Sequence, residues 1–242
     1  MADWLSVAEA AEKLGVNPSR IHARIREGSL SAEKVGRQWT IALDDLRRVS
    51  GHTGPGRPLS ARSAWALLAV AANNPAVAEL SPPDRSKARK RFRDLLDPDA
   101  IPLDIHRVEA WLGSVLGNRA ARRLFVAAAQ DLQDIRVDQR LHLSGVSRPE
   151  SNISSGDAVE GYVSSDDLEG LVDDYLMSGA SRRRANVVLH VVGPGVGLPL
   201  MTLDEVAASP LAVAADLAEY GDVRELGEAL RLVADLREAH RG

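Results

Sequence analysis

The sequence predicts an α+β protein that consists of a small N-terminal domain and a larger helical and α/β body. Three observations support this fold class. Residues 1–50 contain two helix start signals followed by two short β patterns. Residues 51–60 are rich in glycine and proline and therefore form a linker. The apolar spacing is helical over residues 61–130 and alternates between strands and helices over residues 131–242.

The first two helices of the N-terminal domain have clear end signals. Ser6 and Glu9 form a capping box, so a helix begins directly after Ser6. Gly15 ends that helix. Asn17 followed by Pro18 starts the second helix, because asparagine is a good N-cap and proline is favoured at the first helical position.

The rest of this domain completes a recognisable layout. Ile21 and Ile25 lie on one face of the second helix, which we expect to end at Gly28. Two short strands follow, over residues 32–34 and 38–41, and a third short helix begins at residue 44 or 45 and continues to 49. Two helices joined by a tight turn and followed by a hairpin form a winged helix-turn-helix, a layout that places its second helix in the DNA major groove.

The predicted DNA-binding residues come from the second helix and from the hairpin. The inward-facing isoleucines turn residues 19, 23 and 26 to the opposite side and leave 20, 22 and 24 on the flanks. Arginines at these positions can contact phosphates or bind guanine edges with two hydrogen bonds. The predicted set is Ser19, Arg20, His22, Arg24, Arg26, Lys34, Arg37 and Gln38. The alternative, an arginine-rich helix that simply faces solvent, does not account for the agreement of caps, turn and hairpin.

The body begins with helical spacing that continues to about residue 129. Strand patterns follow over residues 141–146, 160–163 and 185–192, with a helix over 165–177 between the last two. Two final helices cover residues 210–220 and 222–239. On the last helix Val223, Leu226, Leu230, Val233 and Leu236 share one face and should be buried.

A second basic cluster lies in the segment DRSKARKRFRDLL, residues 84–96. As a helix it hides Ala88, Phe92, Leu95 and Leu96 and exposes its cations. Two interpretations of these cations remain open. They form either a helix face that is exposed to solvent or a set of additional phosphate contacts that enlarges the DNA-binding surface. The residues predicted for these secondary contacts are Arg85, Lys87, Arg89, Lys90, Arg91 and Arg93.

The charge is distributed unevenly along a chain whose formal net charge is -4. Residues 1–50 carry eight Lys and Arg against seven Asp and Glu, and residues 51–130 carry twelve against seven. Residues 131–242 carry ten against twenty, a net charge of -10. The first half can therefore approach a polyanion that the last part would repel.

The sequence predicts no catalytic residues, no cofactor and no metal. Without cysteine the chain has no thiolate ligands, and its six histidines lack ligand spacing. The glycine-rich run over residues 187–197 departs from a dinucleotide-binding fingerprint at Leu198. Ser165, Asp166 and Asp167 are better explained as a helix start than as a two-metal site. His142 and His190, each between apolar strand neighbours, should lie on a surface or an interface.

Two resemblances to known families follow from the motifs. Residues 4–49, with S-x-x-E-A-A-x-x-L-G-V and V-G-R-x-W-x-I, resemble the winged domains of the MerR and phage-excisionase family. That resemblance implies a second helix in the major groove and a wing that contacts DNA. The order of patterns in residues 57–242 resembles the body of AbiEi-like antitoxins of the actinobacterial type, although that family usually carries a different winged domain.

The second resemblance implies a repressor of its own operon that counters a nucleotidyltransferase toxin encoded nearby. We therefore expect operator DNA with paired sites as a partner, a homodimer on that DNA, and no membrane partner. The alternative is an excisionase-like architectural protein that bends DNA for a recombinase. The N-terminal residues lack the pattern of a signal peptide, and the longest apolar run has nine residues, so we expect a cytoplasmic protein.

Overall fold

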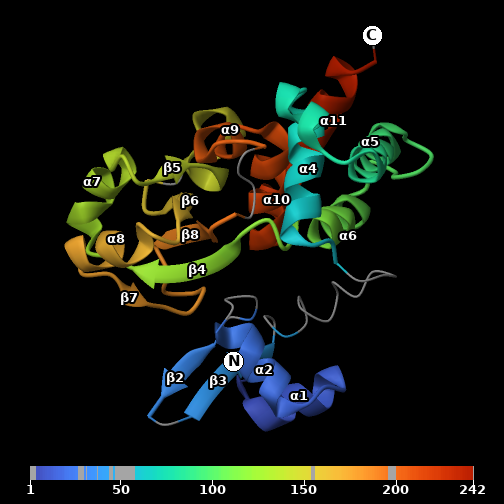
Figure 1. Ribbon diagram of the computed structural model, residues 1–242. Helices are drawn as coiled ribbons and strands as arrows, with labels where there is room; N and C mark the ends of the chain where they lie inside the picture. The colour runs from blue at the N-terminus through green and yellow to red at the C-terminus, as the bar shows by residue number, and fades with distance from the viewer. Residues whose placement is uncertain are drawn as a thin grey trace.

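The computed structural model describes residues 4–26, 30, 32–36, 38–43, 46, 58–153, 156–195 and 200–241. It has the mixed α+β architecture that the sequence predicts. A small N-terminal domain with its own sheet is followed by a larger body of helices and a second sheet (Figure 1). No helix in the described ranges is long and apolar enough to cross a membrane.

The N-terminal domain contains β1 (Trp4–Ser6), α1 (Val7–Leu14), α2 (Pro18–Arg26), β2 (Glu33–Val35) and β3 (Gln38–Ala42). Its antiparallel sheet has the order β1-β3-β2. The two predicted strands are confirmed to within about one residue at each end, whereas β1 was not predicted. The helix end at Gly28 and the third helix from residue 44 or 45 to 49 lie outside the described residues, as does most of the predicted linker.

Five helices build the larger core of the body: α4 (Ala61–Ala71), α5 (Pro82–Leu96), α6 (Ile105–Leu116), α10 (Pro210–Tyr220) and α11 (Val223–Ala239). Trp65 and Leu68 of α4 are fully buried in this core together with Leu217 of α10. Arg237 of α11 donates to the backbone oxygens of Leu95 and Ile101, so the C-terminal helix is tied to the end of α5. A 3-10 turn, η1 (Pro75–Glu79), connects α4 to α5.

The sheet of the body has five strands in the order β5-β6-β8-β4-β7. Only β6 and β8 pair in parallel among them. The strands are β4 (Ala121–Val126), β5 (His142–Leu143), β6 (Val159–Ser164), β7 (Ser178–Gly179) and β8 (Val187–Val192). The remaining elements are α7 (Leu132–Val137), α8 (Leu168–Asp174), α9 (Leu203–Ala207) and the 3-10 turns η2 (Ala129–Asp131), η3 (Gly145–Ser147) and η4 (Pro149–Ser151).

Both faces of the two central strands, β6 and β8, are buried. Val187 and Leu189 of β8 belong to the core on one face. That core also contains Ile135 of α7 and Leu171 of α8. The alternate residue His190 points to the other face, toward the helical core, and is 1% exposed. A strand covered on both sides has a nearly continuous apolar sequence, as β8 does.

Three predictions about the body are corrected by the structure. Residues 121–126 form the strand β4, so the helical pattern does not continue to residue 129. The helix predicted over residues 165–177 is shorter, because α8 covers Leu168–Asp174. Val223 is 83% exposed rather than buried, since it is the first residue of α11 and precedes the buried face that begins at Leu226.

The boundary predicted at residues 130 and 131 does not separate two cores. Strand β4, from the first segment, pairs with β8 and β7 of the second. Helices α10 and α11, from the second segment, share the core of α4, α5 and α6. The body is therefore assembled from interleaved parts of the chain.

Leu176 adopts an unfavourable backbone conformation at the end of α8. Its φ is 49° and its side chain is 86% exposed, so it combines a left-handed backbone with little packing. We expect Leu176→Gly to raise the free energy of unfolding by about 0.5–1 kcal/mol, because glycine adopts this conformation without a steric penalty. Urea unfolding measures the change. Leu103→Gly, at a residue that is 43% exposed and lacks a positive φ, should give no gain.

Candidate nucleic-acid interface

The turn between α1 and α2 is fixed by local hydrogen bonds. The Ser6 backbone N–H donates to Glu9 Oε2 at 2.7 Å, and the Glu9 N–H donates to Ser6 Oγ at 3.3 Å, which completes the predicted capping box. The first of these bonds is the main reason that the pKa of Glu9 is lowered. Gly15 ends α1 with φ 62°, and Asn17 Oδ1 accepts from the Ser19 N–H at 2.9 Å to start α2.

Helix α2 is held against the domain by one side and presents cations on the other. Ile21 is fully buried and Ile25 is half-buried, as predicted. Their burial orients the helix through packing against Ala10 and Ala11 of α1. The exposed residues are Ser19, Arg20, His22 and Arg26, whereas Arg24 is half-buried. Five residues of the predicted DNA-binding set therefore lie on α2, and four of them are exposed.

The wing is the hairpin of β2 and β3. Val35 pairs with Gln38 across its end, and Gly36 has φ 62°, a conformation that suits glycine. Lys34 and Gln38 are exposed. The Lys34 ammonium lies 6.0 Å from the centre of the Trp39 ring, a cation–π contact that orients it near the tip of the hairpin. Arg37, the remaining predicted wing residue, lies outside the described residues.

Strand β1 is a part of this domain that the sequence did not indicate. It places Trp4 opposite Ala42 at the edge of the sheet, where the indole is 41% exposed. A three-residue strand leaves too short an alternation to be recognised in the sequence. The partially exposed tryptophan is its one distinctive signal.

The six predicted secondary phosphate contacts all lie on α5, but they do not share one surface. At 100° per residue, Arg85, Arg89 and Arg93 form one edge of the helix and Lys87 and Arg91 the other. Arg62 of α4 lies beside the second edge, in a shallow depression that Lys87 and Arg91 also line. Lys90 lies between the edges and pairs with Asp94 at 2.8 Å. A single DNA backbone can therefore contact one edge but not all six side chains.

The described residues also contain a buried polar cluster in the body that the sequence did not predict. It consists of Arg119, Ser144, Glu160, Tyr162, His190 and Asp216, and each of these residues is 0–1% exposed. We call it the Asp216 cluster. His190 Nε2 lies 2.8 Å from Glu160 Oε1 and 3.4 Å from Asp216 Oδ1. The expectation that His190 lies on a surface is therefore wrong, because the second face of the sheet is covered by helices.

Asp216 is the centre of this cluster. Its carboxylate accepts from Tyr162 Oη at 2.9 Å and from Arg119 Nε at 3.1 Å, and it also accepts from the Ser144 hydroxyl. Burial by itself would raise the pKa of Asp216, but the positive charges of His190 and Arg119 outweigh it and the pKa is lowered. The cluster joins β6 and β8 to α10 and to the residues after α6.

The cluster contains a serine, a histidine and an aspartate, so its geometry bears on catalysis. The Ser144 hydroxyl donates to Asp216 and not to His190, which is not the arrangement of a serine activated by an imidazole base. All six side chains are shielded from solvent. In the described part of the chain no group of three or more acidic or histidine side chains is arranged to hold a metal ion.

Comparison with known proteins identifies the N-terminal domain. Residues 4–49 match the model of a family described as a helix-turn-helix domain. Neither the curated proteins nor the solved structures gave a match to the chain. The match coincides with the domain that carries α1, α2 and the wing, and a helix-turn-helix domain implies DNA binding.

Proposed function

We propose that the protein is a transcriptional repressor that binds its own operator and serves as the antitoxin of an AbiE-type toxin–antitoxin system. The observation that carries the DNA-binding part is the exposed basic side of α2 beside a basic wing, in a domain that matches a helix-turn-helix family. The antitoxin part is supported by the resemblance of the body, and its cognate partner is a nucleotidyltransferase toxin encoded nearby.

In this proposal α2 enters the major groove with its N-terminal half. Arg20 is exposed on the flank of the helix, where a guanidinium can bind the edge of a guanine with two hydrogen bonds. Ser19, with a small side chain, allows the backbone to approach the bases. His22, Arg24 and Arg26 complete the helix contacts, and Lys34, Arg37 and Gln38 reach the DNA backbone from the wing.

Affinity in this proposal comes from two protomers on paired half-sites. One helix-turn-helix domain of about fifty residues makes few phosphate contacts, and specific binding by such domains is usually strengthened by dimerisation. The acidic region of residues 131–242, with a net charge of -10, is repelled by the DNA and restricts contact to the basic part. The region of residues 131–242 thus supplies the partner-binding function rather than DNA contact or catalysis.

The second candidate is an excisionase-like architectural protein. One observation favours it: the family match covers residues 4–49, and this helix-turn-helix domain is the part of the chain that an excisionase needs. The identity of the adjacent gene separates the two, because a nucleotidyltransferase supports the first and an integrase the second. Co-expression with the adjacent gene product tests the antitoxin role directly. Residues 57–242 should restore growth, whereas rescue by residues 1–56 without rescue by 57–242 would contradict this division of labour.

The secondary phosphate contacts of α5 give a further prediction. Replacing Lys87 and Arg91 by glutamine should weaken binding to all DNA sequences alike and lower the salt slope by about 1.8, or 0.9 for each phosphate contact. Binding titrations at several salt concentrations measure the slope. Circular dichroism checks that the fold is retained. An unchanged salt slope in a folded variant would mean that this edge of α5 faces solvent and does not contact DNA.

A further inference from the structure

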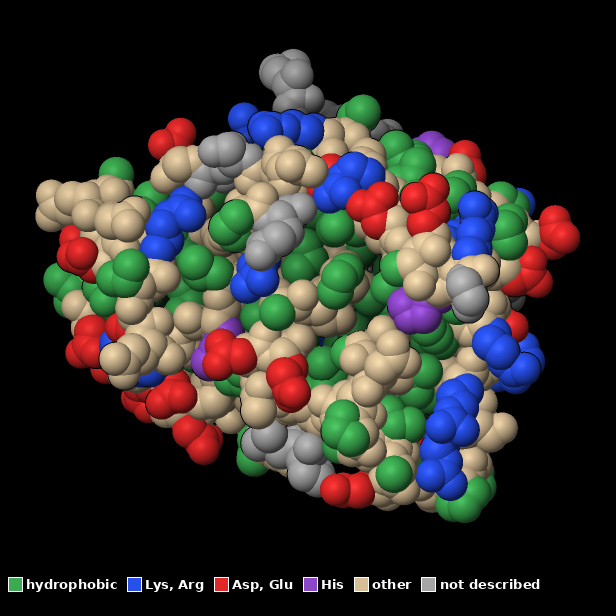
Figure 2. All heavy atoms as spheres, turned by 90° about the horizontal axis from the view of Figure 1, so that it is seen from above, with side chains coloured by type: hydrophobic (Ala, Val, Ile, Leu, Met, Phe, Trp, Pro, Cys, Tyr) green, Lys and Arg blue, Asp and Glu red, His purple; other side chains and the backbone are tan. Residues whose placement is uncertain are grey.

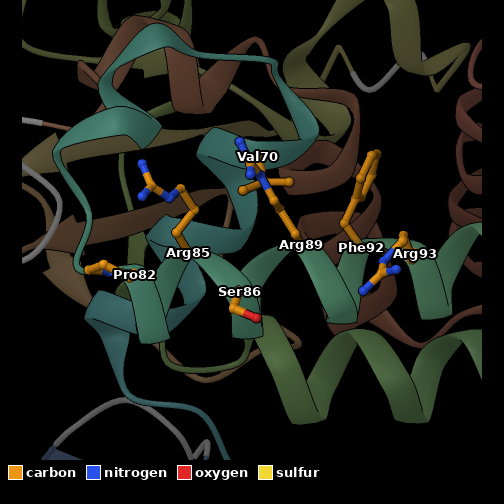
Figure 3. Close-up of a pocket in the computed structure, with 7 residues that line it drawn as sticks. All are labelled: Val70, Pro82, Arg85, Ser86, Arg89, Phe92 and Arg93. Atoms are coloured by element: carbon orange, nitrogen blue, oxygen red, sulfur yellow. The ribbon is translucent and has the colours of Figure 1, made fainter.

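The other edge of α5 borders an open groove between α4 and α5, which we call the α5 groove. It has a volume of ≈ 560 Å³, within the range of ligand-binding grooves. Val70, Pro82 and Phe92 supply its apolar lining, and Arg85, Arg89 and Arg93 supply its cations. Figure 3 shows the side chains of Arg85 and Arg89 extending from α5 to the same side, with Arg89 reaching over Val70.

The cations of the α5 groove are not neutralised within the body. Arg85 donates to the Ala78 backbone oxygen at 3.3 Å, a bond that fixes its direction without cancelling its charge. Within the described residues, Arg89 and Arg93 make no hydrogen bond and no ion pair, and both are exposed. Their α-carbons lie one helical turn apart, about 6 Å along the axis. Figure 3 shows the Arg93 side chain extending to the other side of α5 from Arg89, so the two free guanidiniums can bind anionic groups on the two sides of one docked segment.

The apolar lining of the groove restricts the kind of anion that fits. Phe92 is 6% exposed and is held by an edge-on contact with His240, with ring centroids 5.1 Å apart. Val70 is half-buried beside it. A DNA backbone presents charged phosphates and has no aliphatic side chain to pack on this lining, whereas a protein segment can cover it with a side chain such as leucine.

We propose that the α5 groove is the docking site for an acidic amphipathic segment of another protein. One or two apolar side chains of that segment pack on Val70 and Phe92, and its carboxylates accept bidentate hydrogen bonds from Arg89 and Arg93. The surface charge of the body agrees with this choice. Figure 2 shows a group of Lys and Arg side chains at the lower right of this face, the side on which α5 lies in Figure 1, whereas Asp and Glu side chains are more frequent at the lower left. An acidic segment is thereby attracted more strongly to the α5 side of the body than to the opposite side.

The opposite edge of α5 provides a matched control. Lys87 and Arg91 lie on the same helix and carry the same charge, but they do not line the α5 groove. A ligand attracted by the general charge of α5 responds equally to changes on either edge. A ligand seated in the groove responds to changes at Arg89 and Arg93.

The test uses the full chain and a fluorescently labelled helical peptide with leucines on one face and glutamates along both sides of that face. A second peptide has the same composition, with its leucines distributed around the helix. Fluorescence anisotropy near physiological salt should show saturable binding of the first peptide, with the second at least about tenfold weaker. The Arg89→Glu/Arg93→Glu variant should lose at least about tenfold in affinity, and Lys87→Glu/Arg91→Glu about threefold at most.

Three results would overturn the proposal. Equal binding of the two peptides would mean that charge alone attracts them, and absence of saturable binding would mean that the groove is no docking site. If a labelled DNA duplex binds through Arg89 and Arg93 while neither peptide displaces it, the groove is a phosphate site. Circular dichroism confirms that each variant is folded. Promoter binding by α2 is measured separately, so failure of this proposal does not depend on the proposed function.

Discussion

Replacing Asp216 by alanine is expected to lower the free energy of unfolding by about 3–5 kcal/mol, because it removes a carboxylate that is buried against the Arg119 guanidinium and leaves that cation with Glu219 as its remaining carboxylate partner. The loss also removes the acceptor of the Tyr162 hydroxyl. Typical domains have a total stability of about 5–15 kcal/mol, so this change approaches the limit of folding. Urea unfolding followed by circular dichroism measures it.

Two further variants make this prediction testable even if Asp216→Ala does not fold. Asp216→Asn keeps the shape of the side chain and an acceptor for Arg119, so its loss should be smaller. Asp204→Ala removes a carboxylate that is 83% exposed and lies 2.6 Å from His142, and it should change stability little. Equal effects of Asp216→Ala and Asp204→Ala would mean that the buried cluster does not hold the sheet to α10.

The same carboxylate predicts a dependence on pH. The pKa of Asp216 is lowered in the folded protein, so its contribution is present above the pKa of an unfolded aspartate, about 3.9. That contribution is lost as the pH falls below this value toward the folded pKa. Wild-type stability should therefore fall more steeply below about pH 4 than that of Asp216→Asn.

The second large effect is expected on DNA affinity. Arg20→Ala and Arg24→Ala should each cost about 1–3 kcal/mol of binding free energy and relax the sequence preference, if these side chains contact bases. Arg37→Ala should instead weaken binding to all sequences and lower the salt slope by about one. Lys13→Ala is the control, because this exposed residue lies on α1. Titrations at several salt concentrations separate these outcomes, and unchanged affinity in all three arginine variants would contradict groove docking by α2.

The elements that the sequence predicts best are those with signals inside a few residues. Helix α10 begins at Pro210 and ends at Tyr220 as predicted, because proline sets the first helical residue and Gly221 ends the helix with φ 64°. The capping box of α1 and the Asn17 cap of α2 behave in the same way. These signals act through neighbouring backbone atoms, so they do not depend on the rest of the fold.

Strand β4 was missed because its pattern is ambiguous. Ala121, Leu124 and Phe125 have the spacing of a helix face, and the segment follows three true helices. Its strand conformation is determined by pairing with β8, where Leu124 lies opposite Val188. The partner strand lies more than sixty residues away, so the apolar spacing within β4 itself does not indicate the pairing.

The Asp216 cluster could not be predicted for a related reason. Its central bonds join Arg119 to Asp216 across 97 positions of the chain and Ser144 to Asp216 across 72. An acidic residue in the apolar stretch of α10 was the available signal, since burial of a lone carboxylate requires a partner. The division of the α5 cations between two edges, in contrast, follows from helix geometry once the ends of α5 are known.

We propose above all that the N-terminal domain recognises a specific operator through α2. The most direct measurement is the affinity of the full chain for a duplex carrying its own promoter, compared with a scrambled duplex of the same length and composition at one salt concentration. The account predicts a preference for the promoter of about 10³-fold or more, which Arg20→Ala reduces and Lys13→Ala preserves. Equal affinity for the two duplexes, or a preference that Arg20→Ala leaves intact, would contradict it.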